Sequence, residues 1–113
     1  MPQPTDVLID IACLQQALKT FAADRHWERF HSPKNLAMAL TGEVGELVEL
    51  FQWLSEEESR RIMQDAQSAA KVRHEVADVL LYLVQIINVL GIDIDLAVKE
   101  KLALNARKYP TEI

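Results

Sequence analysis

The sequence predicts an all-α fold, a bundle of four to five helices. Apolar residues recur at intervals of three and four along most of the chain, which is the period of an amphipathic helix. Only three glycines and four prolines occur, and the prolines lie outside the long periodic segments. No alternating pattern with hairpin turns indicates strands. At 113 residues, we expect a single domain over residues 1–113.

The first two helices are predicted in the N-terminal half of the chain. The first runs from about Asp6 to Trp27, where apolar residues follow a helical stripe. The second begins after Ser32, which suits an N-cap, and Pro33 suits the first helical position. Its apolar face extends from residue 36 to residue 54.

A third helical region is predicted to open at Ser55. Ser55 and Glu58 have the spacing of a capping box, and no glycine or proline occurs from there to Gly91. One long helix fits this stretch, and so does a short helix, a loop near residues 67–68 and then a long helix. The residues expected to face inward are Ile62, Ala66, Ala69, Val76, Val79, Leu80, Leu83, Ile86 and Ile87.

A last helix is predicted after Gly91. Glycine suits the C-terminal cap of the preceding helix, because it adopts the left-handed conformation at little cost. Asp93 suits the next N-cap. We expect a helix of about fifteen residues that stops before Pro110.

Charge and cysteine content restrict the functional class. A net charge of −5 argues against binding of duplex nucleic acid, which needs a basic surface. The single cysteine, Cys13, excludes an intrachain disulfide, and its apolar helical surroundings predict a buried structural thiol. The opening "MPQPTD" lacks the regions of a signal peptide, and the apolar run at residues 79–90 is too short to cross a bilayer. We expect a cytoplasmic protein without a membrane partner.

Two acidic pairs carry the strongest chemical signal. "TGEVGELVELFQWL", residues 41–54, places Glu43, Glu46 and Glu49 at three-residue intervals among apolar residues. "RHEVADVLLYL" places Glu75 and Asp78 three apart in the most apolar helical segment. Residues three apart project from nearly the same helix face. Two such helices packed side by side would bring four carboxylates together.

A divalent cation would resolve the repulsion within such a group. Clustered carboxylates disfavour ionisation, and burial adds to the effect. Mg²⁺ takes oxygen ligands and keeps positions for water and phosphates, and all-oxygen ligation favours Mg²⁺ or Mn²⁺ over zinc. The alternative is that the acids lie on solvated helix faces. A di-iron centre needs E-x-x-H on two helices, and Glu28 with His31 is the only copy.

Several segments resemble a known superfamily. "ALTGEVGELVELFQW" followed by "HEVADVLLYL" resembles the MazG-like, all-α nucleoside triphosphate pyrophosphohydrolases, whose signature is E-x-x-E, a variable spacer and E-x-x-D. "FAADRHWERFHSPKNLAMAL" and "KLALNARKYP" are most similar to the dCTP pyrophosphatase branch. The resemblance covers the chain from about Leu18 to Pro110. The stretch between the acidic pairs differs most from that branch.

The resemblance implies a fold of the MazG-like type and a specific activity. The activity would be Mg²⁺-dependent hydrolysis of a dNTP, dCTP or a modified dCTP, to dNMP and pyrophosphate, a nucleotide-pool house-cleaning function. The metal ligands would be Glu43, Glu46, Glu75 and Asp78. Either Glu46 or Glu49 is a candidate to orient or deprotonate the attacking water. The resemblance also implies a homo-oligomer, with a tetramer favoured over a dimer, and sites built from more than one chain.

Substrate contacts are implied in two parts of the chain. For the base and sugar the positions are Trp27, Phe30, His31, Asn35, Trp53 and Tyr82, and for the phosphates they are Lys101, Asn105, Arg107, Lys108 and Tyr109. Aromatic side chains can stack on a base, or they can pack in a core. Lys101, Asn105 and Lys108 share a helical face suited to a polyphosphate, although lysines late in a helix also complement its dipole.

Two alternatives remain open at the level of sequence. The chain could be a hydrolase of the same fold that acts on another nucleotide. It could also be a non-catalytic helical partner protein, whose acids are ordinary surface and whose apolar faces form an oligomer interface. The feature that favours an enzyme is the second acidic pair, Glu75 and Asp78, inside so apolar a helix.

Overall fold

The computed structural model describes residues 3–111. All regular secondary structure in that range is helical. The all-α prediction is confirmed. The elements in chain order are α1 (Ala12–Asp24), the 3₁₀ helix η1 (Glu28–Phe30), α2 (Pro33–Glu49), α3 (Glu56–Arg60), the 3₁₀ helix η2 (Ile62–Gln64), α4 (Ala66–Leu90) and α5 (Ile94–Lys108).

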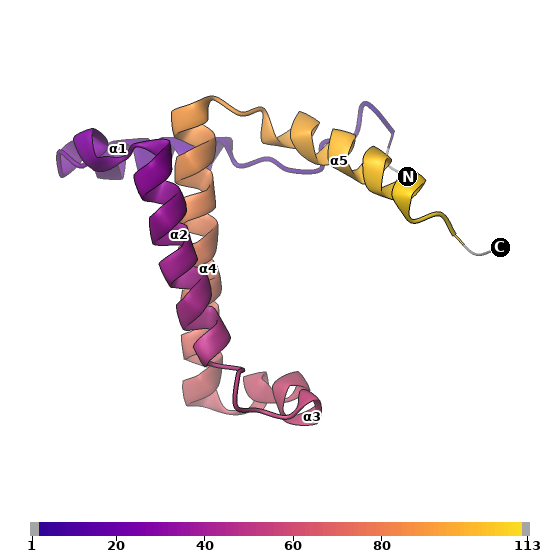
Figure 1. Ribbon diagram of the computed structural model, residues 1–113. Helices are drawn as coiled ribbons and strands as arrows, with labels where there is room; N and C mark the ends of the chain where they lie inside the picture. Colours follow the sequence, from indigo (N-terminus) through magenta and orange to yellow (C-terminus); the bar gives the residue numbers. More distant parts are fainter. Residues whose placement is uncertain (1–2, 112–113) are drawn as a thin grey trace.

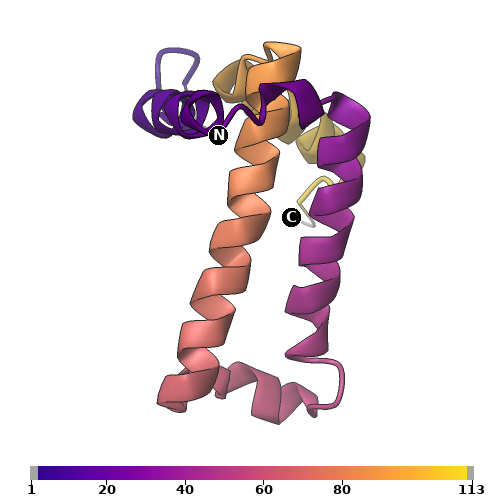
Figure 2. The same ribbon diagram turned by 90° about the vertical axis from the view of Figure 1, so that its left-hand side faces the viewer.

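Helices α2 and α4 form the spine of the molecule. They lie side by side, and the α3 segment joins them at one end (Figures 1 and 2). Helix α1 packs at the other end of α4. Helix α5 leaves α4 through a bend of 106° and runs away from the α2–α4 pair (Figure 1). The packing of α2 against α4 is therefore the most extensive contact between two helices in one chain.

The predicted capping residues begin and end these helices. The Ser32 side chain accepts a hydrogen bond from the backbone N–H of Asn35, the third residue of α2. Ser55 and Glu58 form the reciprocal capping box of α3. Gly91 adopts the left-handed conformation, φ 64°, at the end of α4, and Asp93 caps α5. These local signals were sufficient to place the helix ends because each cap involves neighbours within a few residues.

Four predicted boundaries differ from the structure. Helix α1 begins at Ala12 and not at Asp6, because the N-terminal strap (residues 3–11) is not helical. It ends at Asp24 and not at Trp27, because the chain turns at His26, which has a positive φ. Helix α2 ends at Glu49, and residues 50–54 form a turn before α3. The loop between the short and long helices ends at Asp65, whose side chain caps α4, and not at residues 67–68.

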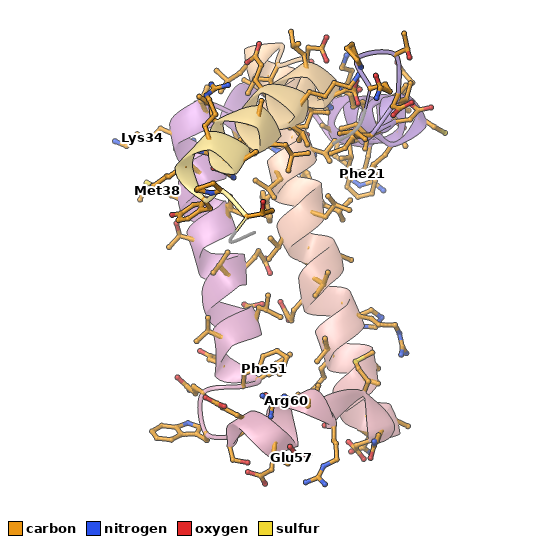
Figure 3. The ribbon with its side chains drawn as sticks, turned by 90° about the vertical axis from the view of Figure 1, so that its right-hand side faces the viewer. Phe21, Lys34, Met38, Phe51, Glu57 and Arg60 are labelled. Carbon is orange, nitrogen blue, oxygen red and sulfur yellow. The ribbon has the colours of Figure 1, made fainter. Side chains whose placement is uncertain are left out.

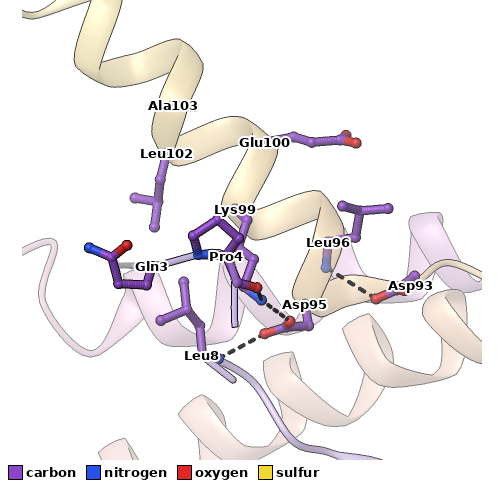
Figure 4. Close-up of a pocket in the computed structure, with 10 residues that line it drawn as sticks. All are labelled: Gln3, Pro4, Leu8, Asp93, Asp95, Leu96, Lys99, Glu100, Leu102 and Ala103. Atoms are coloured by element: carbon purple, nitrogen blue, oxygen red, sulfur yellow. Dashed lines mark hydrogen bonds and ion pairs between the residues drawn. The ribbon is translucent and has the colours of Figure 1, made fainter. Parts of the chain in front are cut away.

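The N-terminal strap is fastened to the start of α5. The Asp95 carboxylate accepts hydrogen bonds from the backbone N–H groups of Leu8 and Ile9, at 2.8 and 3.0 Å. Lys99 contacts Asp95 at 2.8 Å and donates to the Pro4 carbonyl at 3.1 Å. Figure 4 shows Pro4, Leu8, Asp95 and Lys99 among the residues around a pocket of about 560 Å³. The Lys99 ammonium and the two N–H groups hold the pKa of Asp95 at about 2.

The buried core within one chain is small, and apart from Ala69, in the first turn of α4, it lies where α1 and α2 pack against the C-terminal half of α4. It consists of Leu18, Ala22, Leu36, Ala69, Val84 and Ile87. Figure 3 shows Lys34 and Met38 pointing away from α4, whereas Phe51 points into the space between the two long helices. The radius of gyration is 17.2 Å, compared with about 13 Å for a compact chain of this length. One chain therefore has an open shape.

Several residues predicted to be buried are exposed in one chain. Large exposed apolar side chains from the predicted inward faces are Val44, Leu54, Val76, Leu80 and Leu83. The prediction that Cys13 is buried was also wrong. Its position on α1 is rotated well away from the face that buries Leu18 and Ala22, because each helical residue turns by about 100°.

Among the described residues, no single helix has the length and apolar character needed to cross a membrane. Helices α4 and α5 meet that test of length and composition only as a sharply bent pair.

The fastening of the strap predicts a local loss of protection in Asp95→Ala. Removing the carboxylate frees the N–H groups of Leu8 and Ile9, so their hydrogen exchange should accelerate at least about tenfold, the size expected for a charge-assisted hydrogen bond. Exchange by mass spectrometry or NMR measures this at neutral pH. Glu100→Ala, which removes another acid of α5 near the strap, should leave the exchange unchanged. Unaltered exchange in Asp95→Ala would show that the contact does not hold the strap.

Candidate metal and nucleotide site

Helices α2 and α4 bring acids from both predicted pairs together. Glu43, Glu75 and Asp78 each offer a carboxylate oxygen, and these oxygens lie within 4.8 Å of one another. All three side chains are half-buried. Glu43 comes from the middle of α2, whereas Glu75 and Asp78 lie one turn apart on α4. Three of the four acids in the two predicted pairs therefore lie close together in the structure.

Glu46, the fourth acid of the two pairs, lies near these three oxygens but is more exposed. Its charge raises the pKa of both Glu43 and Glu75, so its carboxylate lies near theirs. Glu49 is the last residue of α2 and is exposed. Three-residue steps on a helix fall short of a full turn, so Glu49 is rotated away from Glu43. The acidic cluster in one chain is Glu43, Glu46, Glu75 and Asp78.

Burial makes this cluster electrostatically costly. It raises the pKa of the Glu43 carboxyl from 4.5 to about 7, and the charges of Glu46 and Asp78 add to the effect. The pKa of Glu75 is raised as well, first by burial and then by Glu46. The Oε2 atoms of Glu43 and Glu75 are buried and have no hydrogen-bond partner within residues 3–111. Buried polar atoms without partners are unfavourable.

The donor set suits a hard divalent cation. It consists of carboxylate oxygens on two rigid helices, and two of the oxygens need a partner. Such ligands suit Mg²⁺ or Mn²⁺ rather than softer metals. A cation there would satisfy the buried oxygens and remove the repulsion that raises the pKa values.

A pocket of about 290 Å³ lies beside the acidic cluster and shares Asp78 with it. We call it the aromatic pocket. Its lining residues are Leu18, Phe21, Trp27, His31, Asp78, Leu81, Tyr82 and Gln85. They come from α1, from the turn around η1 and from α4. Apolar walls with a few polar groups are typical of a small-molecule site.

The aromatic side chains of this pocket are held by the turn after α1. His26 has a positive φ of 55°, and the Trp27 N–H donates to the Ala22 carbonyl at 2.9 Å, which turns the chain back. Trp27 packs edge-on to Phe21, with ring centroids 5.5 Å apart, and edge-on to His31, at 6.4 Å. Trp27 remains 44% exposed, so it is accessible to a ligand.

Two other predicted pocket residues, Phe30 and Asn35, lie at the turn beside the pocket and do not line it. The Asn35 side chain donates to the Phe30 carbonyl at 3.0 Å, and its N–H donates to the Ser32 hydroxyl at 3.1 Å. Asn35 therefore fixes the turn that leads from η1 into α2. Phe30 is exposed, and neither residue lines the aromatic pocket.

The remaining predicted substrate residues lie apart from the pocket in one chain. Trp53 is 87% exposed in the turn after α2, at the opposite end of that helix from Trp27. The predicted phosphate-binding residues lie on α5 or directly after it, on the arm that leaves the α2–α4 pair (Figure 1). They are Lys101, Asn105, Arg107, Lys108 and Tyr109.

Sequence reasoning missed part of the pocket wall. Leu18 and Phe21 belong to the apolar stripe of α1, a pattern typical of core residues, and Leu81 lies in the apolar run of α4. Gln85 interrupts that run with a polar side chain. Its spacing from Asp78 and Tyr82, which places all three on one helix face, is the signal that could have identified it.

The chain is similar in sequence to proteins of one known family. Residues 39–112 match the MazG-like family. The chain belongs to the MazG-like family. It is 44% identical over 112 residues to dCTP pyrophosphatase 1 of Homo sapiens, and 43% identical over 112 residues to that of Rattus norvegicus. Both alignments cover 99% of this chain and 63% of the relative, so the chain spans less than two thirds of the length of these curated relatives.

A solved structure shows the same fold. A pyrophosphatase from Archaeoglobus fulgidus DSM 4304 superposes with a TM-score of 0.83 at 36% identity, over 96% of this chain and 100% of that one. The predicted resemblance to the MazG-like superfamily, closest to the dCTP pyrophosphatase branch, is confirmed.

The raised pKa of Glu43 predicts that the metal-free protein is less stable at higher pH. The folded pKa of about 7 lies above the ordinary 4.5, so the fold favours the protonated carboxyl. The contribution of Glu43 to stability is fully present below pH 4.5 and is lost as the pH rises through 7. Glu43→Gln, which stays neutral, should flatten this dependence and raise the free energy of unfolding at pH 8.

Urea denaturation in the presence of a chelator, between pH 5 and 8, measures this effect. Glu49→Gln is the matched control, because Glu49 lies on the same helix but outside the acidic cluster, and it should keep the wild-type profile. A Glu43→Gln profile parallel to that of the wild type would contradict the electrostatic account.

Proposed function

We propose that this chain is a Mg²⁺-dependent nucleoside triphosphate pyrophosphohydrolase. It would hydrolyse a dNTP, dCTP or a modified dCTP, to dNMP and pyrophosphate, as a house-cleaning activity in the cytoplasm. The observation that carries the proposal is the position of Asp78, which belongs to the acidic cluster and also lines the aromatic pocket. A metal-bound triphosphate and a stacked nucleoside could occupy these two adjoining places together. The relatives named dCTP pyrophosphatase 1 support this substrate class.

The acidic cluster would hold the metal through Glu43, Glu46, Glu75 and Asp78. When bound, Mg²⁺, with Mn²⁺ as a substitute, supplies positive charge that offsets the negative charge of the phosphates. The half-buried positions of Glu43, Glu75 and Asp78 keep their oxygens fixed and partly screened from water. The protein's own contribution is therefore mainly positioning, which is what phosphoryl transfer requires.

Glu46 is our candidate for the residue that orients the attacking water. It is the more exposed member of the cluster, yet its charge influences both Glu43 and Glu75. A carboxylate at this border can accept the proton of a water while the water oxygen bonds to phosphorus and the α–β anhydride bond breaks. Glu49, the other candidate, is rotated away from the cluster in this chain.

The nucleoside would lie in the aromatic pocket. Trp27 offers an exposed ring for stacking, which contributes about 1–3 kcal/mol per base. Tyr82 lies on the same face of α4 as Asp78 and lines the pocket beside it, where a sugar would follow the phosphates. His31 adds a polar group to the pocket wall.

We further propose that the active form is a homo-oligomer, with a tetramer favoured over a dimer. The supporting observation is the apolar stripe of α4, formed by Val76, Leu80 and Leu83, which are 51%, 47% and 42% exposed in one chain. A stripe of this kind on a soluble chain favours burial against another chain. Trp53 and the basic residues of α5 would then reach the site of a partner chain.

Loss of the acidic cluster should abolish turnover. Asp78→Asn and Glu46→Gln should each lower pyrophosphate release by at least about 100-fold, the range for loss of one preorganised electrostatic group. The assay uses Mg²⁺ with a panel of dNTPs, and circular dichroism should report unchanged helix content. Glu57→Gln, an exposed acid of α3, should retain activity. Undiminished turnover in both cluster variants would refute the metal assignment, and a wild type inactive on the whole panel would favour the helical partner protein.

The apolar stripe predicts a change in assembly. Leu80→Glu places a charge in the proposed interface, so it should shift the wild-type oligomer towards monomer and lower its melting temperature. Size-exclusion chromatography with light scattering measures the mass. Met63→Glu changes a residue of η2 with similar exposure, 50%, and should leave the mass unchanged. A monomeric wild type, or an oligomer indifferent to Leu80→Glu, would rule out this interface.

A further inference from the structure

Gln85 is a polar residue in apolar surroundings, and within the described part of the chain its side chain does not help to hold the helices together. It lies within the longest apolar run of the chain, residues 79–90, and is half-buried in the wall of the aromatic pocket. Asn88, one turn further along α4, donates to the Gln15 carbonyl at 3.2 Å and so ties α4 to α1. The Gln85 side chain makes no comparable hydrogen bond within residues 3–111. Its amide is therefore free to meet a ligand.

Helix α4 aligns this amide with the acidic cluster. Asp78, Tyr82 and Gln85 occupy positions i, i+4 and i+7, and all three line the aromatic pocket. A rise of 1.5 Å per residue places Gln85 about 10 Å along the helix axis from Asp78. That separation is comparable with the length of a nucleoside monophosphate. Phosphates held near Asp78 would therefore leave the base near Gln85.

We propose that Gln85 is a specificity-determining residue that hydrogen-bonds the Watson–Crick edge of a cytosine-type base. This inference rests on the proposed function, because it assumes a nucleotide whose phosphates lie at the acidic cluster. A carboxamide carries a donor and an acceptor side by side. Cytosine presents the complementary pair, an exocyclic amine that donates and a ring nitrogen that accepts. Two parallel hydrogen bonds would therefore form.

The surroundings of Gln85 make such bonds decisive for selectivity. Leu18 and Leu81 line the same pocket, and apolar walls strengthen a hydrogen bond by excluding competing water. They also penalise a base that leaves the amide unpaired. An apolar pocket by itself discriminates weakly between bases of similar size, whereas a hydrogen-bonding group within it rejects an analogue that lacks the partner atom.

The test compares two substrates in wild type and Gln85→Leu. The substrates are dCTP and its 2-pyrimidinone analogue, which lacks the exocyclic amine. Wild type should favour dCTP by about tenfold in kcat/KM, the value of one hydrogen bond in a desolvated site. In Gln85→Leu this ratio should fall towards one. The loss for dCTP should appear in KM, with kcat changed less than twofold, because the contact lies away from the reacting phosphates.

Two further variants complete the design. Gln85→Glu can accept from the amine but cannot donate to the ring nitrogen, so it should retain part of the preference for dCTP. This variant keeps the test valid where leucine perturbs the pocket. Gln67→Leu removes an exposed glutamine at the start of α4 and should keep the wild-type ratio.

The outcomes separate this inference from the proposed function. A wild type that releases no pyrophosphate from any dNTP would refute the proposed function itself. An active wild type whose preference for dCTP over the analogue is unchanged in both Gln85 variants would overturn only the role of Gln85. A fall in kcat with an unchanged substrate ratio would also overturn it, because that result would indicate a structural role for the side chain.

Discussion

The packing of α2 against α4 is the constraint on which the candidate site depends. It sets Glu43 opposite Glu75 and Asp78, with oxygens within 4.8 Å. A shift of α2 by one residue would rotate Glu43 by about 100° and disperse the group. The same burial that raises the pKa of Glu43 to about 7 also fixes its oxygens. The close, half-buried carboxylates that suit a cation therefore destabilise the fold when no cation is bound.

The parts of the fold that could be predicted from the sequence are those that depend on near neighbours. The caps at Ser32, Ser55 and Gly91 were predictable because each involves residues a few positions apart. The convergence of the acidic pairs followed from their spacing and from the apolar helices that carry them. The start of α1 could not be predicted, because the strap is held by Asp95, 86 and 87 residues further along the chain.

A helical period identifies an apolar face but not what covers that face. The sequence predicts an inward position for Val76, Leu80 and Leu83, but their side chains are exposed in one chain. In the same way, the sequence does not show what Trp53 and the basic residues of α5 contact, and in one chain they lie away from the pocket. The aromatic pocket gives a second example: Phe21 lies in the apolar stripe of α1, which is typical of core residues, but it lines a cavity.

Helix α4 combines the two properties that the proposals require. Asp78, Tyr82 and Gln85 share one face and line the aromatic pocket, while the apolar stripe is rotated by roughly 160° from them. A partner chain could cover the stripe without obstructing the pocket. No glycine or proline interrupts the helix between Ala66 and Leu90, so the distance between its acidic and its base-contacting positions is fixed. Assembly through the apolar stripe would therefore keep the opposite face of α4 rigid. Only a nucleotide whose phosphate-to-base length matches the fixed distance from Asp78 to Gln85 would then make both contacts.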